Sequence, residues 1–176
     1  MTTSNRPLTS LLDFTPLSRV RRNHGLEHAT LHVLAERMPG KPIAGYSDLG
    51  GFWIVGDLDT EALTDAAAEA LRRLQSGQSG LAVHPNCGTN FVTAGMLAGG
   101  AALMAMAGVG RSRREKLERL PLAISFATLA LMVAQPLGLR LQGSVTTCGQ
   151  PGDLRITEVM LHQAGSSTIH RIKTQG

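Results

Sequence analysis

The chain is poor in aromatic residues and in cysteine. Only 3% of its 176 residues are aromatic although 43% are hydrophobic, so the apolar content is mostly Ala, Leu, Val and Met. The two cysteines, Cys87 and Cys148, are too few for a disulfide framework, and thiol or metal chemistry is the better interpretation of Cys87. With one Trp, one Tyr and four Phe for stacking, nucleic-acid binding has only the net charge of +4 in its favour, and we expect none.

Two catalytic signatures are also missing. There is no Gly-rich phosphate loop of the G-x-x-x-x-G-K-[ST] kind and no G-x-S-x-G nucleophile elbow, so P-loop nucleotide hydrolysis and serine hydrolysis have no support. Residues 1–20 lack a continuous apolar core, and we therefore expect no N-terminal signal peptide.

The chain does contain two long uncharged stretches, residues 91–110 and 120–139, each of twenty residues. Stretches of this length are candidate membrane spans. Five of the 17 basic residues lie between them in residues 111–119, which is typical of a loop at a membrane surface. The pattern predicts a two-helix transmembrane hairpin. Gly95 and Gly99 on one helix face would allow close helix packing, including packing between two copies in a homo-oligomer.

The remaining segments predict an α+β fold around this hairpin. After a flexible N-terminus at 1–15, the region 16–90 is predicted to hold two helices and three short strands, at 16–37, within 42–59, at 60–77 and at 81–84. The tail, 140–176, alternates like three strands that complete the sheet, at 140–148, 153–161 and 167–174. The fold class is therefore predicted as α+β, a small mixed sheet with two helices, interrupted by the membrane hairpin.

Such a chain would be integral to the cell (inner) membrane, with the lipid bilayer as a partner. The positive-inside rule places residues 111–119 on the cytoplasmic side and the rest of the chain outside. Because no signal or earlier span is visible to export the first ninety residues, the orientation stays undecided.

The first motif is HGLEH, residues 24–28, on the predicted first helix. Residues four apart on a helix are neighbours, so His24 and His28 can present two imidazoles to one metal ion. Glu27 lies between them, and H-x-x-E-H is the inverzincin order of ligands and general base. His32, one turn further on, is interpreted as a group outside the ligand set or as a plain surface residue.

The second motif is HPNCGTNF, residues 84–91, just ahead of the first apolar stretch. A catalytic zinc ion needs a third protein ligand, and His84 and Cys87 are the candidates. Pro85 and Gly88 suit a ligand-bearing turn. An inert thiol and a histidine at the end of a strand are the alternative interpretation. His162 and His170, on predicted tail strands, are expected only to face solvent.

Together the two motifs resemble those of the YqhQ-like bacterial membrane proteins, H-G-A-E-H followed by H-P-R-C-G-T-S-F at a membrane segment. The matching residues are His24, Gly25, Glu27, His28, His84, Pro85, Cys87, Gly88, Thr89 and Phe91. Leu26 and Asn86 depart from the pattern, and the chain is shorter, as in a separate uncharacterised family that shares the site. The resemblance implies a metal-dependent enzyme but no substrate.

Two functions follow from these residues, and the third alternative is a soluble helical-hairpin protein that binds no metal. In the first, a zinc-dependent hydrolase acts on a peptide or membrane-protein substrate, with His24, His28 and His84 as ligands, Glu27 as general base and Cys87 as a further ligand or neighbour. In the second, all four ligands come from the protein and close the site, and the chain scaffolds or regulates a partner without catalysis.

Overall fold

The structure is a computed structural model that describes residue 12, residues 14–164 and residues 167–176. It divides into two compact units. The first contains the described residues up to His84 together with Gly143–Gly176, and the second is Pro85–Gln142. Residues 1–11 and 13 of the expected flexible N-terminus lie outside the described residues.

The first unit is built on helix α2, Thr15–Arg37, and helix α3, Thr60–Gln75. α2 has proline in its first turn, where the missing N–H costs nothing, and it ends before Gly40, which has a positive φ of 82°. α3 is capped as predicted by Asp59, whose carboxylate accepts the backbone N–H groups of Glu61 and Ala62.

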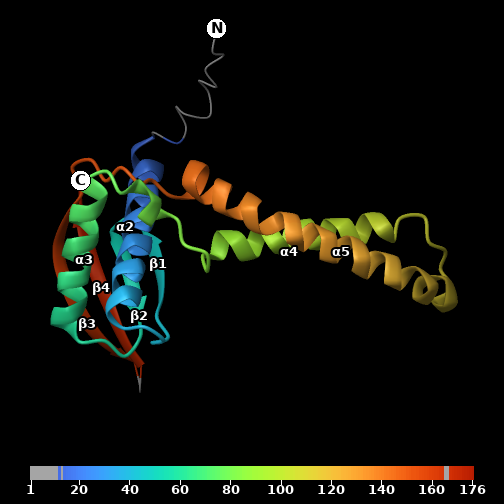
Figure 1. Cartoon of the computed structure of the whole chain (residues 1–176), viewed down its shortest axis with the longest axis horizontal. Helices are drawn as coiled ribbons and strands as arrows, with labels where there is room; N and C mark the ends of the chain where they lie inside the picture. Colours follow the sequence, from blue (N-terminus) through green and yellow to red (C-terminus); the bar gives the residue numbers. More distant parts are fainter. Residues whose placement is uncertain (1–11, 13, 165–166) are drawn as a thin grey trace, which may run out of the picture. The chain divides into compact units, whose positions relative to one another are not determined.

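A four-stranded sheet lies against these helices (Figure 1). Its strands are β1 Ala44–Asp48, β2 Gly51–Val55, β3 Arg155–Ala164 and β4 Ser167–Gln175, in the order β1-β2-β4-β3. Every neighbouring pair is antiparallel. The prediction of an α+β fold is confirmed, but the mixed sheet is wrong: the tail supplies two strands rather than three, and the hairpin they form adds antiparallel to β2.

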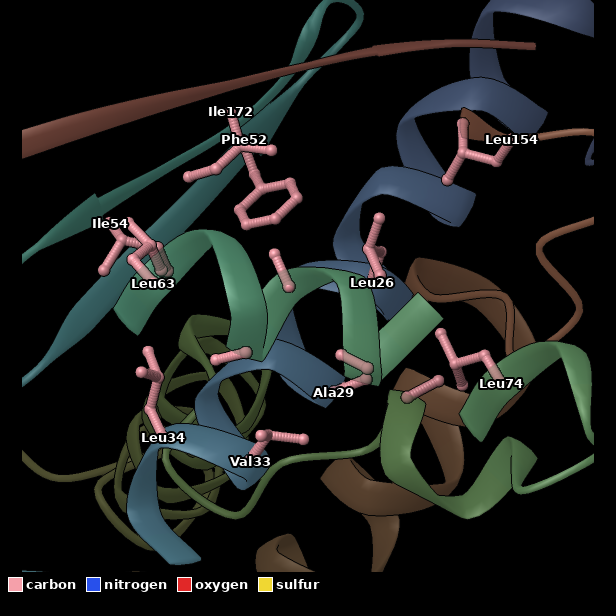
Figure 2. Packing of buried hydrophobic residues seen from close by; sticks show 14 of the residues in the cluster. Leu26, Ala29, Val33, Leu34, Phe52, Ile54, Leu63, Leu74, Leu154 and Ile172 are labelled. Atoms are coloured by element: carbon pink, nitrogen blue, oxygen red, sulfur yellow. The ribbon is translucent and has the colours of Figure 1, made fainter. Parts of the chain in front are cut away.

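The hydrophobic core lies between the sheet and the two helices. Phe52 and Ile54 alternate with outward residues on β2, as a half-buried strand requires, and both are fully buried. Figure 2 shows them with Ile172 of β4 and with Leu26 and Leu63 of the helices. Truncation of a buried phenylalanine such as Phe52 to alanine costs about 3–5 kcal/mol, so this layer holds the unit together.

Two segments predicted as strands are not strands. The first half of 81–84 belongs to a short 3-10 turn, Ser79–Ala82, and residues 142–146 form a π-helical turn. In the second segment the guanidinium of Arg21 donates to the carbonyl oxygens of Ser144 and Thr147. Because these side-chain hydrogen bonds satisfy the backbone, the segment needs no strand partner.

The second unit is a helical hairpin of α4, Gly88–Ala105, and α5, Arg113–Leu141, which pack along each other (Figure 1). α5 begins inside the basic stretch, so the predicted basic loop at 111–119 is mostly the first two turns of a helix. An i,i+4 pair, Arg114 with Glu118 at 2.8 Å, stabilises those turns. The connection between the helices is accordingly shorter than predicted.

Only one of the two predicted membrane spans has the length and the apolar composition that a transmembrane helix needs. Within the described part of the chain, one helical stretch, Arg113–Thr146, is long and apolar enough to cross a membrane. The prediction of two spans is corrected in this respect: α4 ends at Ala105 and begins with Gly88, Thr89 and Asn90, which leaves it too short an apolar stretch. The 20 uncharged residues of α5 extend over about 30 Å, the thickness of a bilayer's hydrocarbon core.

Candidate metal centre

Two histidines of α2 lie next to each other on one face of the helix. His24 and His28 are four residues apart, and their ring centroids are separated by 4.4 Å with the rings tilted by 60°. His28 is buried and His24 is half-buried. The juxtaposition expected from the helical spacing is thus present.

Backbone carbonyl groups fix the proton on one nitrogen of each ring. The Nδ1 atom of His28 is 2.8 Å from the carbonyl oxygen of Ala82, and Nδ1 of His24 is 3.0 Å from that of Thr146. A carbonyl oxygen only accepts, so each Nδ1 carries the hydrogen and each Nε2 of a neutral ring keeps its lone pair. Metal-ligating histidines are typically oriented in this way, because the second hydrogen bond selects the tautomer that binds the ion.

A glycine allows one of these carbonyl-bearing segments to lie close to α2. A methyl group on Gly25 would overlap the backbone carbonyl of Cys148, so a larger residue would push residues 146–148 away from the helix. The segment is also held by the backbone N–H of Cys148, which donates to the carbonyl of Arg21 at 2.9 Å. Gly25 therefore contributes to the orientation of the His24 ring, because it lets the segment whose Thr146 carbonyl accepts the His24 hydrogen bond lie close to α2.

His84 supplies a third imidazole in the first unit. Its ring centroid is 5.7 Å from that of His28 and 4.9 Å from that of His32. Burial, together with the neighbouring His32 and His28, lowers the pKa of His84 to about 4. His84 is therefore neutral at pH 7, the state in which an imidazole binds a metal ion.

The ring spacing suits a common ion. Zinc–nitrogen bonds of about 2.0–2.1 Å in a tetrahedral arrangement put ligand ring centroids roughly 5 Å apart. The distances of 4.4 Å between His24 and His28 and 5.7 Å between His28 and His84 lie on either side of that value. His32 differs from His24 and His28 because its Nε2 is hydrogen-bonded, at 2.9 Å to the carbonyl of Val83.

Glu27 lies against strand β1. The residue is 3% exposed, and Oε2 accepts a hydrogen bond of 2.5 Å from the hydroxyl of Ser47. A Cβ atom on Gly45 would lie 2.6 Å from Oε1, so the absence of a side chain at Gly45 makes room for this carboxyl group. The sequence pattern does not identify Ser47 and Gly45, because their relation to Glu27 arises from the packing of β1 on α2.

The comparisons with known proteins give a family but no activity. A model of the domain of unknown function DUF6391 matches residues 19–159, most of the chain. The chain belongs to the DUF6391 family. An uncharacterized protein of Picosynechococcus sp. is 42% identical over 113 residues, which is 54% of this chain and 55% of that protein, so the chain spans about half of its relative's length. No solved structure matches.

Membership of DUF6391 bears on the resemblance to the YqhQ-like proteins. The family is a separate uncharacterised one, as expected, but nothing in the comparisons links it to the YqhQ-like proteins. The histidines predicted as ligands are present together in the first unit of this DUF6391 chain. Cys87 lies in the second unit as the residue before α4, where its thiol lies 3.6 Å from the hydroxyl of Thr89.

The two remaining histidines of the described chain differ from each other. His162 of β3 is exposed and its ring lies 5.5 Å from the indole of Trp53. His170 of β4 is fully buried, 3.0 Å from the hydroxyl of Thr60, so the expectation that it faces solvent is wrong. Burial lowers the pKa of His170, with the carboxylate of Asp59 acting in the opposite direction. His170 is a core residue.

Proposed function

We propose that this DUF6391 protein is a membrane metalloprotein that binds one zinc ion through His24, His28, His84 and Cys87. The observation that carries the proposal is the pair of Nδ1–H bonds to backbone carbonyls, which leaves Nε2 of His24 and His28 in the ligating form. His84, neutral at pH 7 and next to His28, adds a third nitrogen.

Cys87 is the proposed fourth ligand or close neighbour. It follows His84 by three residues, and three residues of extended chain reach at most about 10 Å, so its sulfur stays near the imidazole of His84 whatever the turn. Histidine nitrogens and a cysteine sulfur, the donors of His24, His28 and Cys87, are the set that zinc prefers.

The membrane location is supported by α5 and by the surface of the hairpin. Large apolar side chains on both helices are exposed, among them Met96, Leu103 and Met104 of α4 and Leu129 and Met132 of α5. A hairpin with apolar side chains of this size in contact with solvent needs lipid or a partner to cover it. The uncharged length of α5 favours lipid. Gly95 and Gly99 remain the proposed contact if two copies associate.

The catalytic form of this proposal is zinc-dependent hydrolysis of a peptide substrate, with Glu27 as the general base. Its support is that Glu27 is nearly fully buried beside a proposed ligand and held by Ser47. Burial of a carboxyl group costs free energy, and buried ionisable groups beside candidate ligands are typical of functional sites. The non-catalytic form keeps four protein ligands and gives Glu27 only the structural bond to Ser47.

Metal content tests the site itself. Detergent-purified protein is analysed by elemental mass spectrometry after zinc loading, as wild type, His28→Ala, Cys87→Ala and the matched control His162→Ala, which changes an exposed histidine of β3. We expect about one zinc per chain in wild type and control, and its loss in His28→Ala. Absence of metal from the wild type, or equal loss in the control, would overturn the proposal.

The same measurement separates the two forms. If Cys87→Ala keeps its zinc, three protein ligands suffice and a position remains for water, which favours catalysis. Glu27→Gln then keeps the metal and abolishes cleavage of a peptide library read by mass spectrometry. Cleavage by wild type and Glu27→Gln at the same rate would remove Glu27 from the mechanism.

A further inference from the structure

Residues 111–119, the end of the connection and the first two turns of α5, carry every charge between residues 91 and 139. Five basic and two acidic residues give residues 111–119 a net charge of +3: Arg111, Arg113, Arg114, Lys116 and Arg119 against Glu115 and Glu118. All nine residues are exposed. We call this segment the basic tip.

Both acidic residues of the basic tip are engaged within it. Glu118 pairs with Arg114 at 2.8 Å, which cancels one positive charge. Glu115 lies against Gly110, and both carboxylates line a shallow hollow beside the connection between the helices together with Arg119. Glu115 is also in the first turn of α5, where the helix dipole favours a negative charge.

The cations that remain are free to meet a partner. Arg119 donates to the carbonyl of Ala105 at 2.9 Å and so ties the basic tip to the end of α4. Among the described residues, none forms a hydrogen bond or ion pair with the side chains of Arg111, Arg113 or Lys116. Three unneutralised cations therefore lie at the point where the helix surface changes from charged to apolar.

We propose that the basic tip binds the anionic headgroups of phospholipids. This inference rests on the proposed membrane location of α5 and adds the class of lipid. Its basis is charge complementarity: phosphate headgroups lie at the boundary of the hydrocarbon core, and exposed Leu117 and Leu120 place the cations at the start of the apolar part of α5. Nucleic acid also attracts cations, but the basic tip has no aromatic side chain on which a base could stack.

The expected preference follows from the charges. A basic side chain at an anionic surface contributes a free energy equivalent to about a fivefold gain in binding, so three would give a preference of roughly a hundredfold. Salt and the carboxylate of Glu115 reduce this value, and we expect about tenfold at physiological ionic strength. The preference falls further at high salt because exposed charges are screened.

The test uses the full chain in phosphatidylcholine vesicles, alone or mixed equally with phosphatidylglycerol. Flotation first measures whether protein associates with either vesicle. Electron spin resonance then compares the fraction of spin-labelled phosphatidylglycerol and phosphatidylcholine immobilised by the protein. The variant is Arg111→Gln/Arg113→Gln/Lys116→Gln. Its matched control, Lys41→Gln/Arg72→Gln/Arg155→Gln, removes three exposed charges of the first unit.

Support would be a preference for phosphatidylglycerol in wild type and control that is lost in the tip variant and at high salt. Equal immobilisation of both lipids by the wild type, or an unchanged preference in the tip variant, would overturn the inference while leaving the membrane location intact. Failure to float with either vesicle would overturn both. Retention of an RNA oligonucleotide, lost in the tip variant, with no lipid preference would assign the basic tip to nucleic acid instead.

Discussion

The contact between Gly45 and Glu27 gives the sharpest prediction of stability. A methyl group on Gly45 would lie 2.6 Å from Oε1 of Glu27 and 3.0 Å from its Cδ and Cγ atoms, so the carboxyl group must move by about 0.8 Å to reach an ordinary contact of 3.4 Å. Glu27 is nearly fully buried, and a shift of that size also disturbs its 2.5 Å hydrogen bond with Ser47.

Three effects determine the cost of Gly45→Ala. Overpacking of a buried site costs about 1–3 kcal/mol, and a lost hydrogen bond costs about 0.5–1.5 kcal/mol. Replacing glycine restricts the unfolded chain and returns about 0.4–1 kcal/mol. We therefore expect Gly45→Ala to lower the free energy of unfolding of the first unit by about 2–3 kcal/mol.

Urea unfolding followed by tryptophan fluorescence measures this quantity. The chain has a single tryptophan, Trp53, which lies on β2 next to Arg171 and Tyr46, so its emission reports the first unit alone. Gly80→Ala is the matched control, because nothing lies within 4 Å of a methyl group there. It is expected to be neutral or slightly stabilising.

A double-mutant cycle identifies the cause of the loss. In a Glu27→Ala background the methyl group of Gly45→Ala has no carboxyl group to displace, so its cost should fall to that of Gly80→Ala. The reasoning is refuted if Gly45→Ala is no more destabilising than the control, or if its cost is the same with and without Glu27.

Three further predictions use the same fluorescence assay. Gly25→Ala should cost more than Gly45→Ala, since the methyl group meets the backbone of Cys148 rather than a side chain; equal costs would contradict this. For His84, the folded pKa of about 4 is below the unfolded value near 6.5, so metal-free protein should lose stability as pH falls from about 6.5 to 4. His84→Gln should make the free energy of unfolding less dependent on pH over this range. Asp48→Asn removes the negative charge and one of the two oxygens that accept the Arg171 hydrogen bonds of 2.7 and 2.8 Å, and should cost about 1–2 kcal/mol because Asp48 is partly exposed; an unchanged urea midpoint would argue against it.

The parts of the fold that could be predicted are those with local signals. Pro16 and Gly40 mark the limits of α2, and Asp59 marks the start of α3. Segments held by distant residues could not be predicted. Residues 142–146 alternate like a strand, yet the buried Gln142 donates to Asn90 at 2.6 Å and Arg21 binds the carbonyls that follow. Those partners are 52 to 126 residues away in the chain.

The same division applies to the candidate metal centre. The spacing of His24 and His28 is local, so a shared helix face could be predicted. Which ring nitrogen is available to a metal could not, because it depends on the carbonyls of Ala82 and Thr146, which lie 54 and 122 residues from the histidines that they orient. The solvent exposure wrongly expected for His170 is the same kind of error: Leu161 opposite it is half exposed, whereas His170 is fully buried and contacts Thr60 of α3, 110 residues away in the chain.

The position of Glu27 around the helix axis links the core to the site. At about 100° per residue, Glu27 lies about 60° from His24 and 100° from His28. It therefore stands at the edge between the histidine face and the face that packs on β1. Glu27→Gln keeps a group that can bond Ser47, whereas Ser47→Ala removes that bond and leaves the carboxyl group. If Glu27 is a catalytic base, Glu27→Gln should reduce turnover more than Ser47→Ala does. If Glu27 is purely structural, the protein has no turnover to lose, and Ser47→Ala should reduce stability more than Glu27→Gln does.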